Sequence, residues 1–275
     1  MHWKRPLLWT VALLTAATAC TVPSHSAPRP AAHEGQERAQ GQERRPAPAP
    51  VPSSQRSAAP SAGLPSVGVL LDDEGHWCTA SVVASPRGNV VATAAHCVYE
   101  YGVYAEGFSF VPGFRGRGAA SAPYGKWKVR AIQVDDAWRR TGDDARDYAF
   151  LTLEPDGRGR QVQQVVGGAP ADWGSGPRRH VTVVGYPNEE HNPANRPISC
   201  TTDTAEDPDL AGSMVMRCAG FWDGTSGSPW LADHRDAAHP GRVIGVLSGG
   251  DTDTTSTAVL FDARARALYT RAVKA

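Results

Sequence analysis

The hexapeptide ATAAHC, residues 92–97, follows directly on the strand-like pair Val90-Val91 and contains the first of three segments that decide the fold. The second segment is DYAFL, residues 147–151, in which an aspartate immediately precedes an apolar run. The third is GTSGSP, residues 224–229, in which glycines flank a serine. Histidine, aspartate and serine therefore occur in this order, far apart along the chain.

These three residue types together are typical of nucleophilic catalysis. A serine hydroxyl is a poor nucleophile at neutral pH and needs a base within about 2.6–3.2 Å. Histidine can take that proton and return it to the leaving group, and a carboxylate on its other ring nitrogen fixes the tautomer. We therefore expect Ser226 as nucleophile, His96 as base and Asp147 as the orienting carboxylate. Glycines let the backbone aim two N–H donors at an oxyanion, which predicts that the donors belong to Gly224 and Ser226.

The three segments resemble those of the chymotrypsin-like (trypsin-superfamily) serine peptidases, in which the order is also His, Asp, Ser. Residues 93–97 match the family's Thr-Ala-Ala-His-Cys block, and residues 147–151 are similar to its Asp-Ile-Ala-Leu-Leu segment. Residues 224–229 resemble its Gly-Asp-Ser-Gly-Gly-Pro block, in the form seen in bacterial glutamyl-endopeptidase-like members. The resemblance implies a serine endopeptidase with two six-stranded antiparallel β-barrels and the catalytic residues in the cleft between them.

The resemblance also implies which residues contact a polypeptide substrate. An extended substrate is expected to pair with the segment Ser248, Gly249 and Gly250. Gly220 occupies the position at which trypsin-like members carry the aspartate that selects Arg or Lys, and Leu247 stands where glutamyl-specific members have a histidine. Neither a basic nor an acidic primary specificity is therefore predicted. Thr225 replaces an aspartate that other members pair with a newly cut N-terminal amine, so we expect activity without such a cut.

The five cysteines fit an exported protein. The family implies a disulfide between Cys78 and Cys97, and Cys200 with Cys218 would close a second short loop, which leaves Cys20 over. There is no Cys-x-x-Cys and no spaced histidine pair, so we expect no metal and no cofactor.

The N-terminus has the pattern of an export signal. Lys4 and Arg5 precede an apolar stretch at residues 7–19, which is shorter than the roughly 20 residues of a spanning helix. Cys20 follows at once, as in a bacterial lipobox, although Ala17 departs from the preferred Leu, Val or Ile. We expect a signal peptide at 1–19 and a lipid anchor on Cys20, with ordinary secretion as the alternative. Either route places the protein outside the cell, free or on the outer face of the bacterial membrane.

The remaining chain divides by composition. Residues 20–63 are rich in Pro, Ala, Gln and Arg and nearly free of large apolar side chains, which predicts a disordered linker or, alternatively, a propeptide. From residue 64 the chain reads as short strands, at 126–131, 148–153, 181–184 and 243–247 among others. We expect an all-β domain at 64–275, with barrel one at about 64–157, barrel two at about 158–260 and a helix at about 262–273 capped by Asp262.

Several alternatives remain open from the residues themselves. Four nearby aspartates compete with Asp147 as the orienting acid, Asp144 first and then Asp143, Asp135 and Asp136, and Ser228 competes with Ser226. A catalytically silent relative that acts as a binding module is a second function, and an α/β-hydrolase esterase is a third, although its nucleophile elbow and residue order differ. The 28 basic and 28 acidic side chains balance, so no global field favours nucleic acid. The expected partner is a polypeptide substrate, and the expected state is a monomer.

Overall fold

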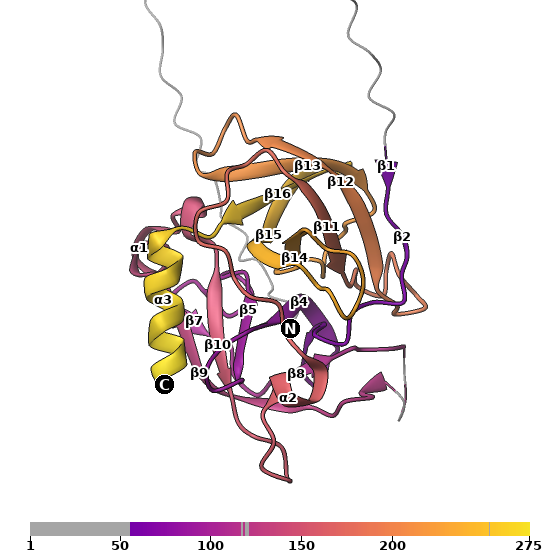
Figure 1. Cartoon of the computed structure of the whole chain (residues 1–275), viewed down its shortest axis with the longest axis vertical. Coiled ribbons are helices and arrows are strands. Elements are labelled where there is room, and N and C mark those ends of the chain that lie inside the picture. Colours follow the sequence, from indigo (N-terminus) through magenta and orange to yellow (C-terminus); the bar gives the residue numbers. More distant parts are fainter. Residues whose placement is uncertain (1–55, 117, 119–120, 253) are drawn as a thin grey trace, which may run out of the picture. The chain divides into compact units, whose positions relative to one another are not determined.

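The computed structural model describes residues 56–275, apart from 117, 119–120 and 253. The predicted signal peptide, Cys20 and most of the predicted linker lie outside the described residues. Two six-stranded antiparallel barrels make up the domain, as predicted (Figure 1). Within the described residues, no helix is both long and apolar enough to span a bilayer.

Barrel one closes in the order β10-β5-β4-β3-β8-β9. Its strands are β3 (Val67–Leu71), β4 (His76–Val83), β5 (Val90–Thr93), β8 (Ser109–Pro112), β9 (Trp127–Val134) and β10 (Ala149–Leu153). A short hairpin of β6 (Tyr99–Glu100) and β7 (Val103–Tyr104) follows the histidine segment. All five residues of β10 are buried, which explains why its sequence is a continuous apolar run rather than an alternation.

Barrel two closes in the order β11-β12-β13-β16-β15-β14. Its strands are β11 (His180–Gly185), β12 (Ile198–Glu206), β13 (Ser213–Ala219), β14 (Pro229–Ala232), β15 (Arg242–Thr252) and β16 (Thr255–Leu260). One apolar core includes Val69 from barrel one, Val246 from barrel two and Leu268 from the C-terminal helix. This shared core fixes the two barrels against each other, and hence the loops that meet between them.

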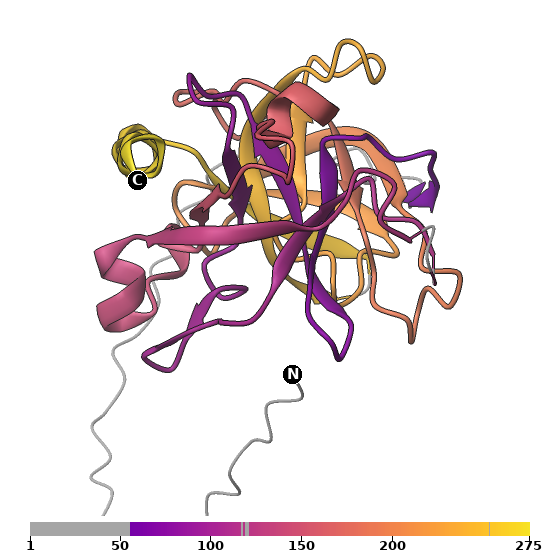
Figure 2. The same cartoon turned by 90° about the horizontal axis from the view of Figure 1, so that it is seen from below.

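The predicted C-terminal helix is α3 (Ala263–Lys274), and Asp262 caps it by accepting from the N–H groups of Arg264 and Ala265. Ala265 and Leu268 are fully buried on its inner face. The helix lies beside β9 and β10, and Figure 2 shows it nearly end-on at the side of the strands. Three shorter helical segments were not predicted: α1 (Asp136–Thr141), η2 (Asp144–Arg146) and α2 (Val162–Val166).

The predicted domain boundaries differ from the structure in two places. Residues 56–63, assigned to the linker, are ordered against barrel two: β1 (Arg56–Ser57) pairs in parallel with β13, and β2 (Ala59–Pro60) pairs with β12. Backbone hydrogen bonds hold this segment, and they leave no apolar signature in the sequence. The second difference is α2, which was placed in barrel two, although Val162 packs in the core of barrel one.

Candidate active site

His96 lies just beyond the end of β5, in a turn that closes on Ala95. The carbonyl of Ala95 accepts hydrogen bonds from the N–H groups of Val98 and Tyr99. Ala94 and Ala95 are fully buried, whereas the His96 side chain keeps 26% of its surface exposed. The small alanines therefore anchor the turn in barrel one, and the imidazole remains accessible.

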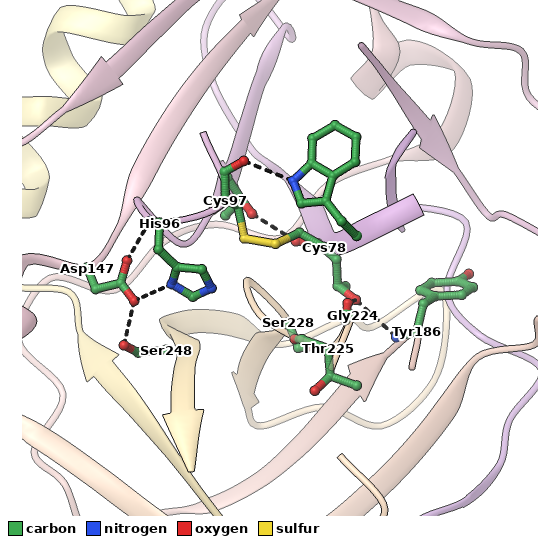
Figure 3. The surroundings of a disulfide bond; sticks show 12 residues. Cys78, His96, Cys97, Asp147, Tyr186, Gly224, Thr225, Ser228 and Ser248 are labelled. Atoms are coloured by element: carbon green, nitrogen blue, oxygen red, sulfur yellow. Dashed lines mark hydrogen bonds and ion pairs between the residues drawn. A yellow bond between two sulfur atoms is a disulfide. The ribbon is translucent and has the colours of Figure 1, made fainter. Parts of the chain in front are cut away.

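Asp147 stands between η2 and β10 and is 2% exposed. Its carboxylate accepts three hydrogen bonds: from the His96 N–H at 2.9 Å, from His96 Nδ1 at 2.7 Å and from Ser248 Oγ at 2.6 Å (Figure 3). A carboxylate only accepts, so Nδ1 carries the hydrogen and Nε2 is the basic nitrogen. The predicted pairing of His96 with Asp147 is present in this geometry.

The charges of this pair shift both pKa values. Burial opposes protonation of His96, but the charge and hydrogen bond of Asp147 outweigh it and raise the pKa of His96 above 6.5. Burial likewise opposes ionisation of Asp147, and contact with His96 and Ser248 outweighs it, so the pKa of Asp147 is lowered. The pair is thus held with an ionised carboxylate and an imidazole that is a stronger base than usual.

The other acidic candidates have structural contacts instead. Asp143 caps η2 and Asp135 caps α1, while Asp136 pairs with Arg139 at 3.3 Å. Asp144 lies in the first turn of η2. All five of these aspartates are among the described residues, and only Asp147 is hydrogen-bonded to His96.

Ser226 lies on the loop between β13 and β14 and is partly exposed. Its carbonyl accepts from the Thr79 N–H at 2.8 Å, and the next residue, Gly227, donates its N–H to the Leu247 carbonyl at 2.7 Å. Thr79 follows Cys78, which is bonded to Cys97 beside the histidine, and Leu247 precedes Ser248. Both anchors of the loop therefore adjoin the surroundings of the His96–Asp147 pair.

Ser228 has a different environment from its neighbour. Its side chain is fully buried, and its hydroxyl donates to the Thr225 carbonyl at 2.6 Å. A Cβ on Gly227 would come within 2.2 Å of the Thr79 carbonyl oxygen and of Thr93 Oγ1, so only glycine fits between the two serines. The close packing explains why a glycine must follow Ser226.

Gly224 has a φ of +94°, which glycine adopts without strain. This conformation suits the tight turn that was predicted from the sequence. Within the described residues, the N–H groups of Gly224 and Ser226 donate no hydrogen bond, whereas those of Thr225, Gly227 and Ser228 do. Two unengaged N–H groups on this turn are what an oxyanion site needs.

The predicted substrate segment lies on β15 beyond the end of its pairing with β14. The last pair between these strands is Pro229 with Val246. In the described structure, residues 248–250 therefore have no strand partner on the side where β14 pairs with the earlier part of β15. On its other side β15 pairs with β16, and a Cβ on Gly250 would lie 2.2 Å from the Thr255 carbonyl oxygen. Gly220 has a φ of +101° and faces Ala58 of the N-terminal segment.

Both predicted disulfides are present, Cys78–Cys97 and Cys200–Cys218. The first holds the histidine turn to β4, and the second joins β12 to β13 beside the serine loop. His96 and the sulfurs of Cys78 and Cys97 offer atoms within 4.8 Å of one another. Because the sulfurs are bonded to each other, they provide no thiolate for a metal.

The sequence interpretation missed two contacts of the serine loop. Thr79 is fully buried and bonded to three segments around the site, and Trp222 stacks on His191 with ring centroids 4.2 Å apart. The contacts of Thr79 have a sequence signal, because a threonine inside an otherwise buried strand has a hydroxyl that needs a partner. No local pattern signals the second, since it joins two loops.

Two closed six-stranded antiparallel barrels, with a hydrogen-bonded His–Asp pair on the first barrel and a glycine-flanked serine on a loop of the second, are features of the chymotrypsin-like class of serine hydrolases. The family model described as Trypsin matches residues 54–268, so the chain belongs to the trypsin family, whose members are serine-type endopeptidases.

Solved structures of proteases share this fold. Protease Anisep from Arthrobacter nicotinovorans has 24% identity and a TM-score of 0.70, and covers 78% of this chain and 99% of its own. The thermostable serine protease AL20 from an extremophilic microorganism has 27% identity and a TM-score of 0.68, with the same coverages of 78% and 99%. A Glu endopeptidase has 15% identity and a TM-score of 0.64, covering 81% of this chain and 99% of its own, which shows a common fold alone. A search of curated proteins found no match.

Proposed function

We propose that this chain is a secreted or lipid-anchored endopeptidase that hydrolyses peptide bonds through Ser226, His96 and Asp147. Ser226 Oγ attacks the scissile carbonyl while His96 Nε2 takes its proton, and the ionised Asp147 stabilises the imidazolium that forms. The N–H groups of Gly224 and Ser226 bind the oxyanion of the tetrahedral intermediate. His96 then gives the proton to the leaving amine, and water hydrolyses the acyl-enzyme by the same steps.

The observation that carries this proposal is the carboxylate of Asp147. It is 2% exposed and accepts hydrogen bonds from the backbone N–H of His96, from His96 Nδ1 and from the Ser248 hydroxyl. Because Nδ1 carries the imidazole hydrogen, Nε2 is left as the free base. Burying a carboxylate is costly unless its oxygens are hydrogen-bonded. A purely structural histidine would not require this arrangement next to a serine loop with two unengaged N–H groups.

The extracellular location rests on two different observations. Two disulfides support an oxidising compartment, because such bonds are rare in the reducing cytosol. The leader pattern at residues 1–19 and Cys20 supports export with or without lipid attachment. Mass spectrometry of the mature N-terminus distinguishes a diacylated Cys20 from an unmodified chain.

Clearance of casein by the purified protein tests the proposed activity. Wild type should hydrolyse casein, and Ser226→Ala, which removes only the hydroxyl, should not. Thr152→Val is the control, because it too removes a hydroxyl, one that is buried and bonded to the Ala272 carbonyl; the variant should lose stability but keep the activity of its folded fraction. A folded wild type that cleaves no protein or peptide would contradict the proposal and favour a binding module.

A further inference from the structure

The turn that carries the two oxyanion donors needs a fixed backbone orientation. We call residues 222–226 the oxyanion turn. The Gly224 N–H belongs to the peptide between Asp223 and Gly224, and it points toward an oxyanion only while that peptide keeps one orientation. Glycine rotates more freely than other residues, so the sequence that permits the turn does not by itself hold it.

Three hydrogen bonds from outside the oxyanion turn hold three of its carbonyls. The Asn188 N–H donates to the Asp223 carbonyl at 2.6 Å, Thr79 Oγ1 donates to the Gly224 carbonyl at 3.0 Å, and the Thr79 N–H donates to the Ser226 carbonyl at 2.8 Å. A carbonyl and the N–H of the same peptide point in opposite directions. The bond from Asn188 therefore fixes the peptide that carries the Gly224 N–H, and the two bonds from Thr79 fix the peptides directly before and after the one that carries the Ser226 N–H.

Thr79 provides two of these three bonds. Its hydroxyl also accepts from the Tyr186 N–H at 3.0 Å, and its own carbonyl accepts from Thr93 Oγ1 at 2.9 Å. The N–H, the carbonyl and the hydroxyl of Thr79 each have a hydrogen-bond partner, in a residue with no exposed surface. Figure 3 shows Tyr186, Gly224 and Thr225 grouped next to Cys78, which precedes Thr79 in the chain.

Thr225 cannot replace this hydroxyl. Its Oγ1 donates to the Trp222 carbonyl at 2.7 Å, which is a bond within the turn itself. Such a local bond shapes the turn but does not attach it to either barrel. The side-chain attachment of Gly224 to barrel one comes from Thr79, on β4.

We propose that the Thr79 hydroxyl is a positioning residue, which holds the oxyanion turn in its active orientation without a newly cut N-terminal amine. This inference rests on the proposed function. A hydroxyl suits the role because it donates one hydrogen to the Gly224 carbonyl while it accepts one from the Tyr186 N–H. Valine has nearly the same shape and can do neither, so both backbone groups would lose their partner.

The variants Thr79→Val and Thr79→Ser test this role. Thr79→Val should lower kcat for a peptide substrate by about 10- to 100-fold, less than the 10²–10³ lost when an oxyanion donor itself is removed. KM should stay within about twofold, because the turn acts on the intermediate. The affinity for a peptidyl boronic acid, which becomes tetrahedral on the serine oxygen, should fall together with kcat. Thr79→Ser keeps the hydroxyl and should restore most of kcat.

Thr152→Val is the matched control. Thr152 is also fully buried, and its Oγ1 donates to a backbone carbonyl at 2.8 Å, but this carbonyl is that of Ala272 on α3 and not one of the oxyanion turn. This variant should melt at a lower temperature than wild type and keep the wild-type kcat. Thr79→Ala gives the same test as Thr79→Val if the valine does not fold.

The proposal is overturned if folded Thr79→Val or Thr79→Ala keeps the wild-type kcat and boronate affinity. It is also overturned if Thr152→Val loses as much kcat, since the effect would then be one of stability. In wild type, fast hydrogen exchange at the Tyr186 amide would contradict it independently of any variant. A wild type without peptidase activity refutes the proposed function, whereas an active wild type with an unchanged Thr79→Val refutes only the role of Thr79.

Discussion

Replacing Asp147 by asparagine changes one atom of the buried carboxylate and should nearly abolish activity. The wild-type carboxylate accepts three hydrogen bonds, two from His96 and one from Ser248. An amide can accept with its oxygen, but its nitrogen only donates. If the nitrogen faces His96 Nδ1, the imidazole hydrogen must move to Nε2, and the base that should take the Ser226 proton is lost.

The opposite orientation of the amide is no better. Its nitrogen then faces the His96 backbone N–H, so two donors oppose each other in a site that is 2% exposed. The same substitution in another serine peptidase lowers kcat by about 10⁴ through the wrong tautomer. We expect a loss of this size, which corresponds to about 5 kcal/mol of transition-state stabilisation.

The assay is the pH profile of kcat/KM on a chromogenic peptide ester and amide. Without the negative charge of Asp147, burial outweighs the weaker attraction of Glu100, so the pKa of His96 should fall and the acid limb of any residual activity should move to lower pH. Asp136→Asn, an exposed aspartate paired with Arg139, is the control and should keep wild-type activity. Residual activity of Asp147→Asn within tenfold of wild type, with an unmoved acid limb, would refute the reasoning.

Three further predictions follow from the same contacts. Ser248→Ala removes one of three donors to Asp147 and should lower kcat/KM by about tenfold, measured by steady-state kinetics; an unchanged value would show that the two His96 donors suffice. The raised pKa of His96 keeps it protonated to a higher pH, so wild-type kcat/KM should fall on the acid side through a midpoint above 6.5; a midpoint below 6.5 would mean that burial dominates. Replacing Cys78 and Cys97 by serine opens a loop with a sequence separation of 19, which costs about 3 kcal/mol and should lower Tm by about 6–12 °C in a calorimetric scan; an equal Tm would indicate a denatured state already restricted at this loop.

The sequence predicted those parts of the fold that depend on local patterns. The buried β10 was visible as an apolar run, and α3 was visible from Asp262, whose carboxylate can cap only a helix that starts at the next residue. The pairing of His96 with Asp147 was predicted through segment matches, since nothing local in either segment indicates a partner 51 residues away.

The remaining features depend on contacts that carry little sequence signal. Residues 56–63 lack large apolar side chains and are nevertheless held by backbone pairing with β12 and β13. The helix α1 is six residues long, too short for a periodic apolar pattern. Thr79 looks like an ordinary strand residue until the serine loop is packed against it, because the two partners of its hydroxyl, Gly224 and Tyr186, lie more than 100 positions away.

The most direct test of the account is reaction with a fluorophosphonate, followed by peptide mapping. Wild type should take up one equivalent, with the phosphorus on Ser226 Oγ, and His96→Ala should react far more slowly because the hydroxyl has lost its base. Labelling of another residue, or equal labelling rates in wild type and His96→Ala, would contradict the claim that these distant residues form one proton-transfer system.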